Sequence, residues 1–137
     1  MKGVAEMRPG QEKTAIGVTP REMEVYRRAA RARWQAKQRQ AAKRRERAWV
    51  LARQAAALLK TQYGAKRVIV FGSLVHDRCF TRWSDVDLAV AGMTWPTYLH
   101  AWSAVEGLSK EIAVDLVEIE TASDRLRRVI EREGVPL

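Results

Sequence analysis

The sequence predicts an α/β (α+β) domain, in which helices cover a small sheet of three or more strands, preceded by a long basic helix. Two observations lead to this prediction. Between residues 48 and 137, short β-branched runs alternate with segments of helical periodicity. Between residues 21 and 63, no glycine or proline interrupts a stretch rich in Ala, Arg, Gln, Glu and Lys, which all favour helix.

The net charge of the chain lies almost entirely in one segment. The 137 residues include 25 Lys and Arg against 16 Asp and Glu, which gives a formal net charge of +9. Residues 20–47 hold eleven basic and three acidic side chains and contribute +8, residues 1–19 contribute +1, and residues 48–137 are balanced. We therefore expect a flexible N-terminus (1–19), a basic helical arm (20–47) and a compact domain (48–137).

The start of the arm carries a helix-capping signal. Thr19 at the N-cap, Pro20 at the first helical position and Glu22 at the third form a capping box. The helix that begins there is expected either to continue for some 40 residues, about 60 Å, or to break near residues 43–47. The arm suits a solvated extension, a surface for homo- or hetero-oligomer formation, or, as a secondary possibility, a nucleic-acid contact.

The elements of the compact domain follow from its periodicity and its punctuation. The β-branched runs predict strands at 66–71, 86–90 and 114–119, with a short helix after the first. Apolar residues at helical spacing predict helices at 49–59 and 95–109, and cap and stop signals predict a last helix at 123–133. Ser123 is the expected N-cap of the last helix, which Gly134 ends. Trp83, Trp95 and Trp102 are expected in the core or at an interface.

The composition excludes several protein classes. A single cysteine, Cys79, rules out an internal disulfide framework and a multi-cysteine zinc site, and it fits a reducing compartment. No apolar run approaches the roughly 18–20 residues of a membrane span, and the first 25 residues lack the apolar stretch of a secretory signal. We expect a soluble cytoplasmic protein with no membrane partner.

The residues that point to chemistry lie at the ends of the predicted strands. Gly72 and Ser73 follow the first strand, where glycine allows a close backbone approach and free N–H groups suit phosphate. Asp85 and Asp87 share one face at the start of the second strand and repel each other unless a divalent cation neutralises them. Asp115 joins them if the third strand lies beside the second. Each feature alone is compatible with ordinary turns and solvent-facing aspartates, but together they fit metal-assisted phosphoryl or nucleotidyl transfer.

These motifs resemble a known family. Gly72-Ser73, eleven intervening residues, Asp85-Val86-Asp87 and a downstream Asp115 are similar to the DNA polymerase β-like nucleotidyltransferase superfamily. The resemblance is greatest to the minimal nucleotidyltransferases (MNT), the antitoxin partners of HEPN toxins, and it extends to the tail at 129–137. It covers roughly residues 48–137 and implies a small mixed sheet of the polymerase β-type nucleotidyltransferase fold.

The resemblance implies roles for individual residues in nucleotide binding. Gly72 and Ser73 would hold the β- and γ-phosphates of ATP, and Ser84 would join the nucleotide site. The chain departs from the family pattern after Gly-Ser, because His76 stands where a basic residue is usual and Asp77 where glycine is usual. The extra carboxylate of Asp77 is expected to repel phosphate unless it points away from the site or is paired, for example with Arg78.

The resemblance also implies the metal site and the reaction. Asp85 and Asp87 would bind two Mg²⁺ ions together with the nucleotide, and Asp115 would complete the second metal site and help to deprotonate the attacking hydroxyl. Members of the MNT group use ATP to add AMP to a tyrosine of the HEPN ribonuclease, which neutralises it. The expected function is therefore Mg²⁺-dependent AMP transfer to a HEPN toxin. The alternatives are an inactive binding module that blocks its partner sterically and, more weakly, an RNA-directed nucleotidyltransferase.

Overall fold

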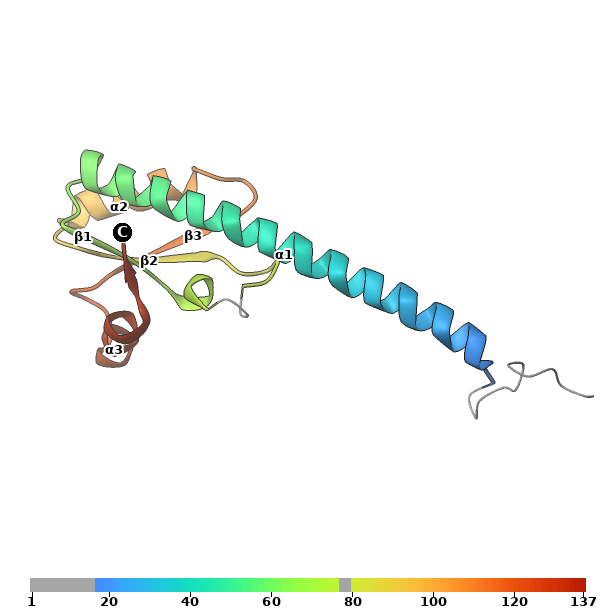
Figure 1. Cartoon of the computed structure of the whole chain (residues 1–137). Helices are drawn as coiled ribbons and strands as arrows, with labels where there is room; N and C mark the ends of the chain where they lie inside the picture. Colours follow the sequence, from blue (N-terminus) through green and yellow to red (C-terminus); the bar gives the residue numbers. More distant parts are fainter. Residues whose placement is uncertain (1–16, 77–79) are drawn as a thin grey trace, which may run out of the picture. The chain divides into compact units, whose positions relative to one another are not determined.

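The computed structural model describes residues 17–76 and 80–137, and Figure 1 shows its elements. The chain divides into two units, residues 1–40 and residues 41–137, and the sheet lies wholly in the second. The elements are α1 (Pro20–Gln62), β1 (Arg67–Phe71), the 3-10 helix η1 (Gly72–Val75), β2 (Val86–Ala91), α2 (Trp95–Glu106), β3 (Val114–Glu118), α3 (Asp124–Glu133) and β4 (Val135–Pro136). The predicted order of strands and helices is confirmed from β1 to α3.

The four strands form a mixed sheet in the order β3-β2-β1-β4. Strand β1 pairs antiparallel with β2 and with β4, whereas β2 and β3 run parallel. The α/β class with a small mixed sheet is therefore confirmed. Strand β4 was not predicted, because it has two residues, one of which is Pro136, and a proline is tolerated only at the edge of a sheet.

Alternation along the strands gives the sheet two buried faces. One face packs against the C-terminal half of α1 and against α2, through apolar residues that include Val70, Leu88 and Leu116. The other face packs against α3, where Ile69 and Ala89 form a smaller cluster with Ile130. In Figure 1, the C-terminal half of α1, which belongs to the second unit, and α2 accordingly lie on one side of the strands and α3 lies on the other.

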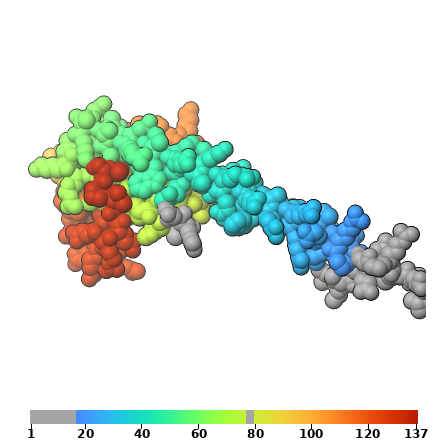
Figure 2. All heavy atoms as spheres, in the orientation of Figure 1, coloured from blue at the N-terminus to red at the C-terminus, as the bar shows by residue number. Residues whose placement is uncertain are grey.

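The C-terminal part of α1 supplies the largest helical contribution to this core. Its buried residues recur at spacings of three and four, namely Ala48, Leu51, Ala52, Ala55, Ala56 and Leu59. Near the end of the helix, Lys60 Nζ donates to the carbonyl of Leu137, and Figure 2 shows the C-terminal residues beside this part of α1. The C-terminus is thereby tied to the first face of the core.

Both predicted helix caps are present. In the first unit, the Thr19 amide donates to Glu22 Oε2 at 2.8 Å and the Glu22 amide donates to Thr19 Oγ1 at 3.1 Å, which is a complete capping box. In the second unit, Ser123 Oγ accepts a hydrogen bond from the Leu126 amide at 3.2 Å at the start of α3. Helix α1 continues without a break over 43 residues, so the first of the two expected alternatives is correct.

The structure contradicts one expectation from the sequence and leaves two others untested. Trp83, Trp95 and Trp102 are 79%, 62% and 41% exposed, so the prediction that they lie in the core is wrong, and an interface role stays a prediction. The boundary between arm and domain at residue 47 also stays a prediction, as does the flexible N-terminus, because residues 1–16 lie outside the described part of the chain. Within residues 17–76 and 80–137, no helix combines the length and apolar character needed to cross a membrane.

Candidate functional site

The strand register brings two of the predicted acidic residues side by side. Asp87 on β2 is paired with Asp115 on the parallel strand β3, and on its other side it is paired with Phe71 at the end of β1. The buried neighbours Val86 and Leu88 point to the opposite face, so Asp87 and Asp115 lie on the face that carries α3. Asp85 directly precedes β2 and is half-buried.

The turn after β1 lies directly against the Asp87 carboxylate. Gly72 has a φ of +76°, a backbone conformation that residues with a side chain adopt at a cost. A Cβ atom at this position would collide with Asp87 Oδ2 and would lie 3.3 Å from its Cγ. Glycine is therefore required here both for the conformation of the turn and for the space. Gly72 and Ser73, the first two residues of η1, are both half-buried, and Gly72 lies against Asp87.

The acidic residues act on one another electrostatically. The pKa of Asp87 is raised from 3.8 to about 6, first because burial disfavours its charged form, and then because Asp115 and Asp85 repel it. A cation beside Asp87 would remove the second of these causes, and carboxylate oxygens are ligands that Mg²⁺ prefers. The chemistry of these donors therefore fits a divalent cation.

The acidic residues do not form a complete metal site by themselves. Among residues 17–76 and 80–137, no three Asp, Glu, His or Cys side chains are grouped so that they could hold a metal ion. Mg²⁺ is usually held by one or two carboxylates together with substrate phosphates and water, rather than by a full set of protein ligands. The arrangement thus fits an ion that binds together with a nucleotide.

The raised pKa of Asp87 predicts a pH dependence of stability in the absence of metal. Because the folded-state pKa lies above the unfolded value, Asp87 contributes stability that is fully present below about pH 4 and is lost as the pH rises through about 6. The side chain of Asp87→Asn cannot ionise, so we expect this variant to be more stable than the parent protein at about pH 7. The expected gain in the free energy of unfolding is about 1 kcal/mol, because Asp87 is only half-buried and solvent screens part of the effect. Near pH 4 the gain should disappear, since the parent carboxyl is then protonated. Urea unfolding of both proteins in EDTA at the two pH values measures the difference. Parallel stability profiles would contradict the assignment.

The structure gives positions for Ser84 and His76 but does not test the remaining predicted roles. Ser84 Oγ accepts a hydrogen bond from the Thr81 amide at 2.9 Å, so this hydroxyl closes the turn that leads into Asp85. His76 Nε2 lies 3.1 Å from Glu133 Oε2, which links the end of η1 to α3. Asp77 lies outside the described residues, as does Cys79. The nucleotide-binding role of Ser84 and the repulsion of phosphate by Asp77 therefore stay predictions.

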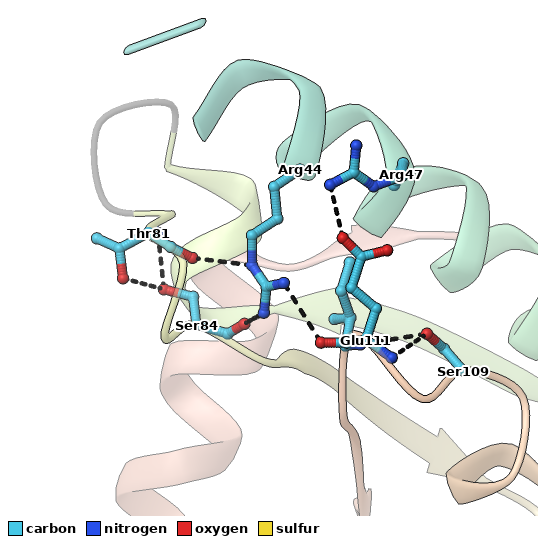
Figure 3. Close-up of polar contacts among 7 residues, drawn as sticks. Arg44, Arg47, Thr81, Ser84, Ser109 and Glu111 are labelled. Carbon is cyan, nitrogen blue, oxygen red and sulfur yellow. Dashed lines mark hydrogen bonds and ion pairs between the residues drawn. The ribbon is translucent and has the colours of Figure 1, made fainter. Parts of the chain in front are cut away.

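The structure adds two arginines that the sequence assigned only to the basic arm. Arg45 Nη2 donates to the carbonyl of Leu74 in η1 at 3.3 Å. Arg44 donates to backbone carbonyls in the two segments that precede β2 and β3, as Figure 3 shows. No local signal distinguishes these two arginines from the other basic residues of the arm, because their partners are 29 or more residues away in sequence.

Comparison with known proteins agrees with the fold and the motifs. The model of the family described as polymerase beta, nucleotidyltransferase, matches residues 53–137. A solved structure provisionally named a minimal nucleotidyltransferase is 33% identical, with a TM-score of 0.56, over 68% of this chain and 95% of that chain. A comparison with curated proteins finds no match.

Two more distant structures share the fold. Both are crystal structures of variants of the toxin–antitoxin complex MntA–HpeT, at 19% and 22% identity and a TM-score of 0.51. The similarity covers 62% of this chain in each case, and 70% and 69% of those chains.

Proposed function

Because this chain belongs to the polymerase β nucleotidyltransferase family, we propose that it transfers AMP from ATP to a partner protein in a Mg²⁺-dependent reaction. The observation that carries this proposal is the in-register pair of Asp87 and Asp115 on adjacent parallel strands. Gly72, which has no side chain and lies against Asp87, also supports the proposal, because a phosphate chain can approach the backbone at this position.

In the proposed site, the acidic residues and the turn have separate tasks. Asp85, Asp87 and Asp115 would hold two Mg²⁺ ions, which when bound neutralise phosphate charge and stabilise the leaving group. Gly72 and Ser73 would hold the β- and γ-phosphates through backbone N–H groups and the Ser73 hydroxyl, and Ser84 would contribute to the same nucleotide site. The burial and repulsion that raise the pKa of Asp87 support this assignment, since perturbed carboxyls are typical of functional sites.

The transfer itself replaces one phosphorus–oxygen bond by another. The oxygen of an acceptor hydroxyl attacks the α-phosphorus of ATP, and the bond from that phosphorus to the bridging oxygen breaks. Pyrophosphate leaves with the bonding electrons, and the hydroxyl proton passes to a carboxylate oxygen of Asp115. The exposed position of Asp115 supports this role, because an acceptor on another molecule can reach it.

The acceptor that we propose is a tyrosine of a HEPN-type ribonuclease, which makes this chain its antitoxin in the cytoplasm. The resemblance of the Gly-Ser and Asp-x-Asp motifs to the MNT group supports this partner. The 33% identical minimal nucleotidyltransferase, 95% of which this chain covers, supports the assignment to the minimal nucleotidyltransferase group on which this partner depends. A small helical protein with an Arg-x4–6-His motif, encoded in the neighbouring reading frame, would be the candidate for this partner.

A mass measurement tests the proposed function. The chain, the candidate partner, ATP and Mg²⁺ are incubated together, and the intact mass of the partner is compared with that in a reaction containing EDTA. We expect the partner to gain the mass of one or more AMP groups only with Mg²⁺, and its ribonuclease activity to fall in parallel. Neutralisation of the ribonuclease without any added mass would overturn AMP transfer and support steric inhibition instead.

A further inference from the structure

The guanidinium group of Arg44 holds three backbone carbonyls from two separate segments. Its Nε donates to the carbonyl of Thr81 at 3.3 Å, and its Nη2 donates to the carbonyl of Ser84 at 3.2 Å. Its Nη1 donates to the carbonyl of Glu111 at 3.3 Å. Figure 3 shows the arginine reaching from α1 between these two segments.

The two segments lead directly into the strands that carry the acidic residues. The turn at 81–84 is followed at once by Asp85 and then by β2. Glu111 lies in the segment before β3, which carries Asp115. A shift of one segment against the other would therefore move Asp85 relative to Asp115, and Arg44 is a side chain that contacts both segments.

Arginine suits this task better than any other side chain. Its planar guanidinium presents five N–H donors in a fixed arrangement, whereas the ammonium group of lysine is a single point of contact. Arg44 is half-buried, and its guanidinium lies 5.9 Å from the centroid of the Phe80 ring, which limits its other orientations. Arg44 also precedes residues 53–137, the part of the chain that the family model matches, so it is not among the matched positions.

From these contacts we infer that Arg44 is a positioning residue, which fixes the segment before Asp85 against the segment before Asp115 so that both aspartates can act on one metal–nucleotide complex. This inference rests on the proposed function. Groups that orient metal ligands without touching the metal typically change metal affinity or activity by roughly 10–100-fold when they are removed.

Arg47 provides a matched control on the same helix. Its Nη2 lies 2.7 Å from Glu111 Oε1, so it contacts the same segment, but through an exposed side-chain ion pair and not through the backbone. Exposed pairs of this kind contribute about 0–1 kcal/mol. Arg44→Met and Arg47→Met therefore remove the same charge from neighbouring turns of α1, and of the two variants only Arg44→Met removes the bridge between the segments.

The first readout is the Mg²⁺ concentration that gives half-maximal AMP transfer. We expect Arg44→Met to raise it roughly 10-fold or more, Arg44→Lys to raise it by a smaller factor, and Arg47→Met to leave it near the parent value. Thermal unfolding is measured to check that each variant is folded. If Arg44→Met is unfolded, Arg44→Lys replaces it, because lysine keeps the charge and much of the aliphatic stem. Equal Mg²⁺ requirements in the Arg44 and Arg47 variants would overturn the inference.

The second readout needs no catalytic activity. The Val86 amide donates to the carbonyl of Ala113 at 2.9 Å, a hydrogen bond that joins the two segments. We expect this amide to exchange with deuterium faster in Arg44→Met than in Arg47→Met. If exchange changes but the parent protein transfers no AMP, the proposed function fails. The part of the inference that concerns catalysis then fails as well. If the parent protein transfers AMP but either readout is the same in Arg44→Met and Arg47→Met, the inference about Arg44 fails while the proposed function stands.

Discussion

Asp87→Asn is expected to lower the rate of AMP transfer by about a thousandfold or more. Asp87 is the central member of the acidic group, because it is paired with Asp115 and is also repelled by Asp85. A bound Mg²⁺ contributes several kcal/mol of transition-state stabilisation, and each 1.4 kcal/mol corresponds to about a tenfold change in rate. The initial rate of AMP incorporation into the partner, measured at saturating ATP and Mg²⁺, tests the prediction.

A control variant separates the loss of a metal ligand from the loss of a charge. Glu106→Gln removes one negative charge from an exposed position at the end of α2, outside the acidic group, and we expect it to keep the parent rate. Asp115→Asn is expected to behave like Asp87→Asn. If Asp87→Asn still neutralises the ribonuclease as well as the parent protein, then catalysis is not the basis of inhibition, and the steric alternative is favoured.

The parts of the fold that were predicted correctly depend on local signals. The capping box at Thr19 and Glu22 and the cap at Ser123 are short-range patterns between a side chain and the backbone three residues away. The three longer strands have β-branched runs that end at glycine or at a charged residue, and their observed bounds lie within one residue of those predicted. Such signals can be read from a window of a few residues.

The parts that were not predicted depend on contacts between distant positions. Strand β4 exists only because residues 135–136 meet β1, more than sixty positions earlier in the chain. The partners of Arg44 are 37, 40 and 67 positions away, so nothing near Arg44 in the sequence separates it from the other basic residues. In the candidate site, the spacing of Asp85 and Asp87 follows from the period of a strand, but the pairing of Asp87 with Asp115 required the sheet order, which the sequence left open.

Gly72→Ala is expected to lower AMP transfer by about a hundredfold while the protein stays folded. The new methyl group would occupy the position next to Asp87 Oδ2, so the carboxylate has to rotate away from the turn. A displacement of about 1 Å in a group that positions reactants can lower a rate by about a hundredfold. The rate of AMP incorporation and the midpoint of thermal unfolding are measured together, because the variant also forces alanine into a conformation with positive φ.

Gly64→Ala is the matched control, since it imposes nearly the same backbone strain without the collision. Gly64 has a φ of +70°, against +76° at Gly72, but an added Cβ at Gly64 has no neighbouring atom within 4 Å. Both variants should lose about 1–2 kcal/mol of stability from the positive φ alone. The collision at Gly72 involves the mobile end of the Asp87 side chain, so it adds little further loss of stability and acts mainly on the position of the carboxylate. We therefore expect the two variants to unfold at similar temperatures and to differ widely in rate, and equal rates would show that the turn at Gly72 does not control the carboxylate used in the reaction.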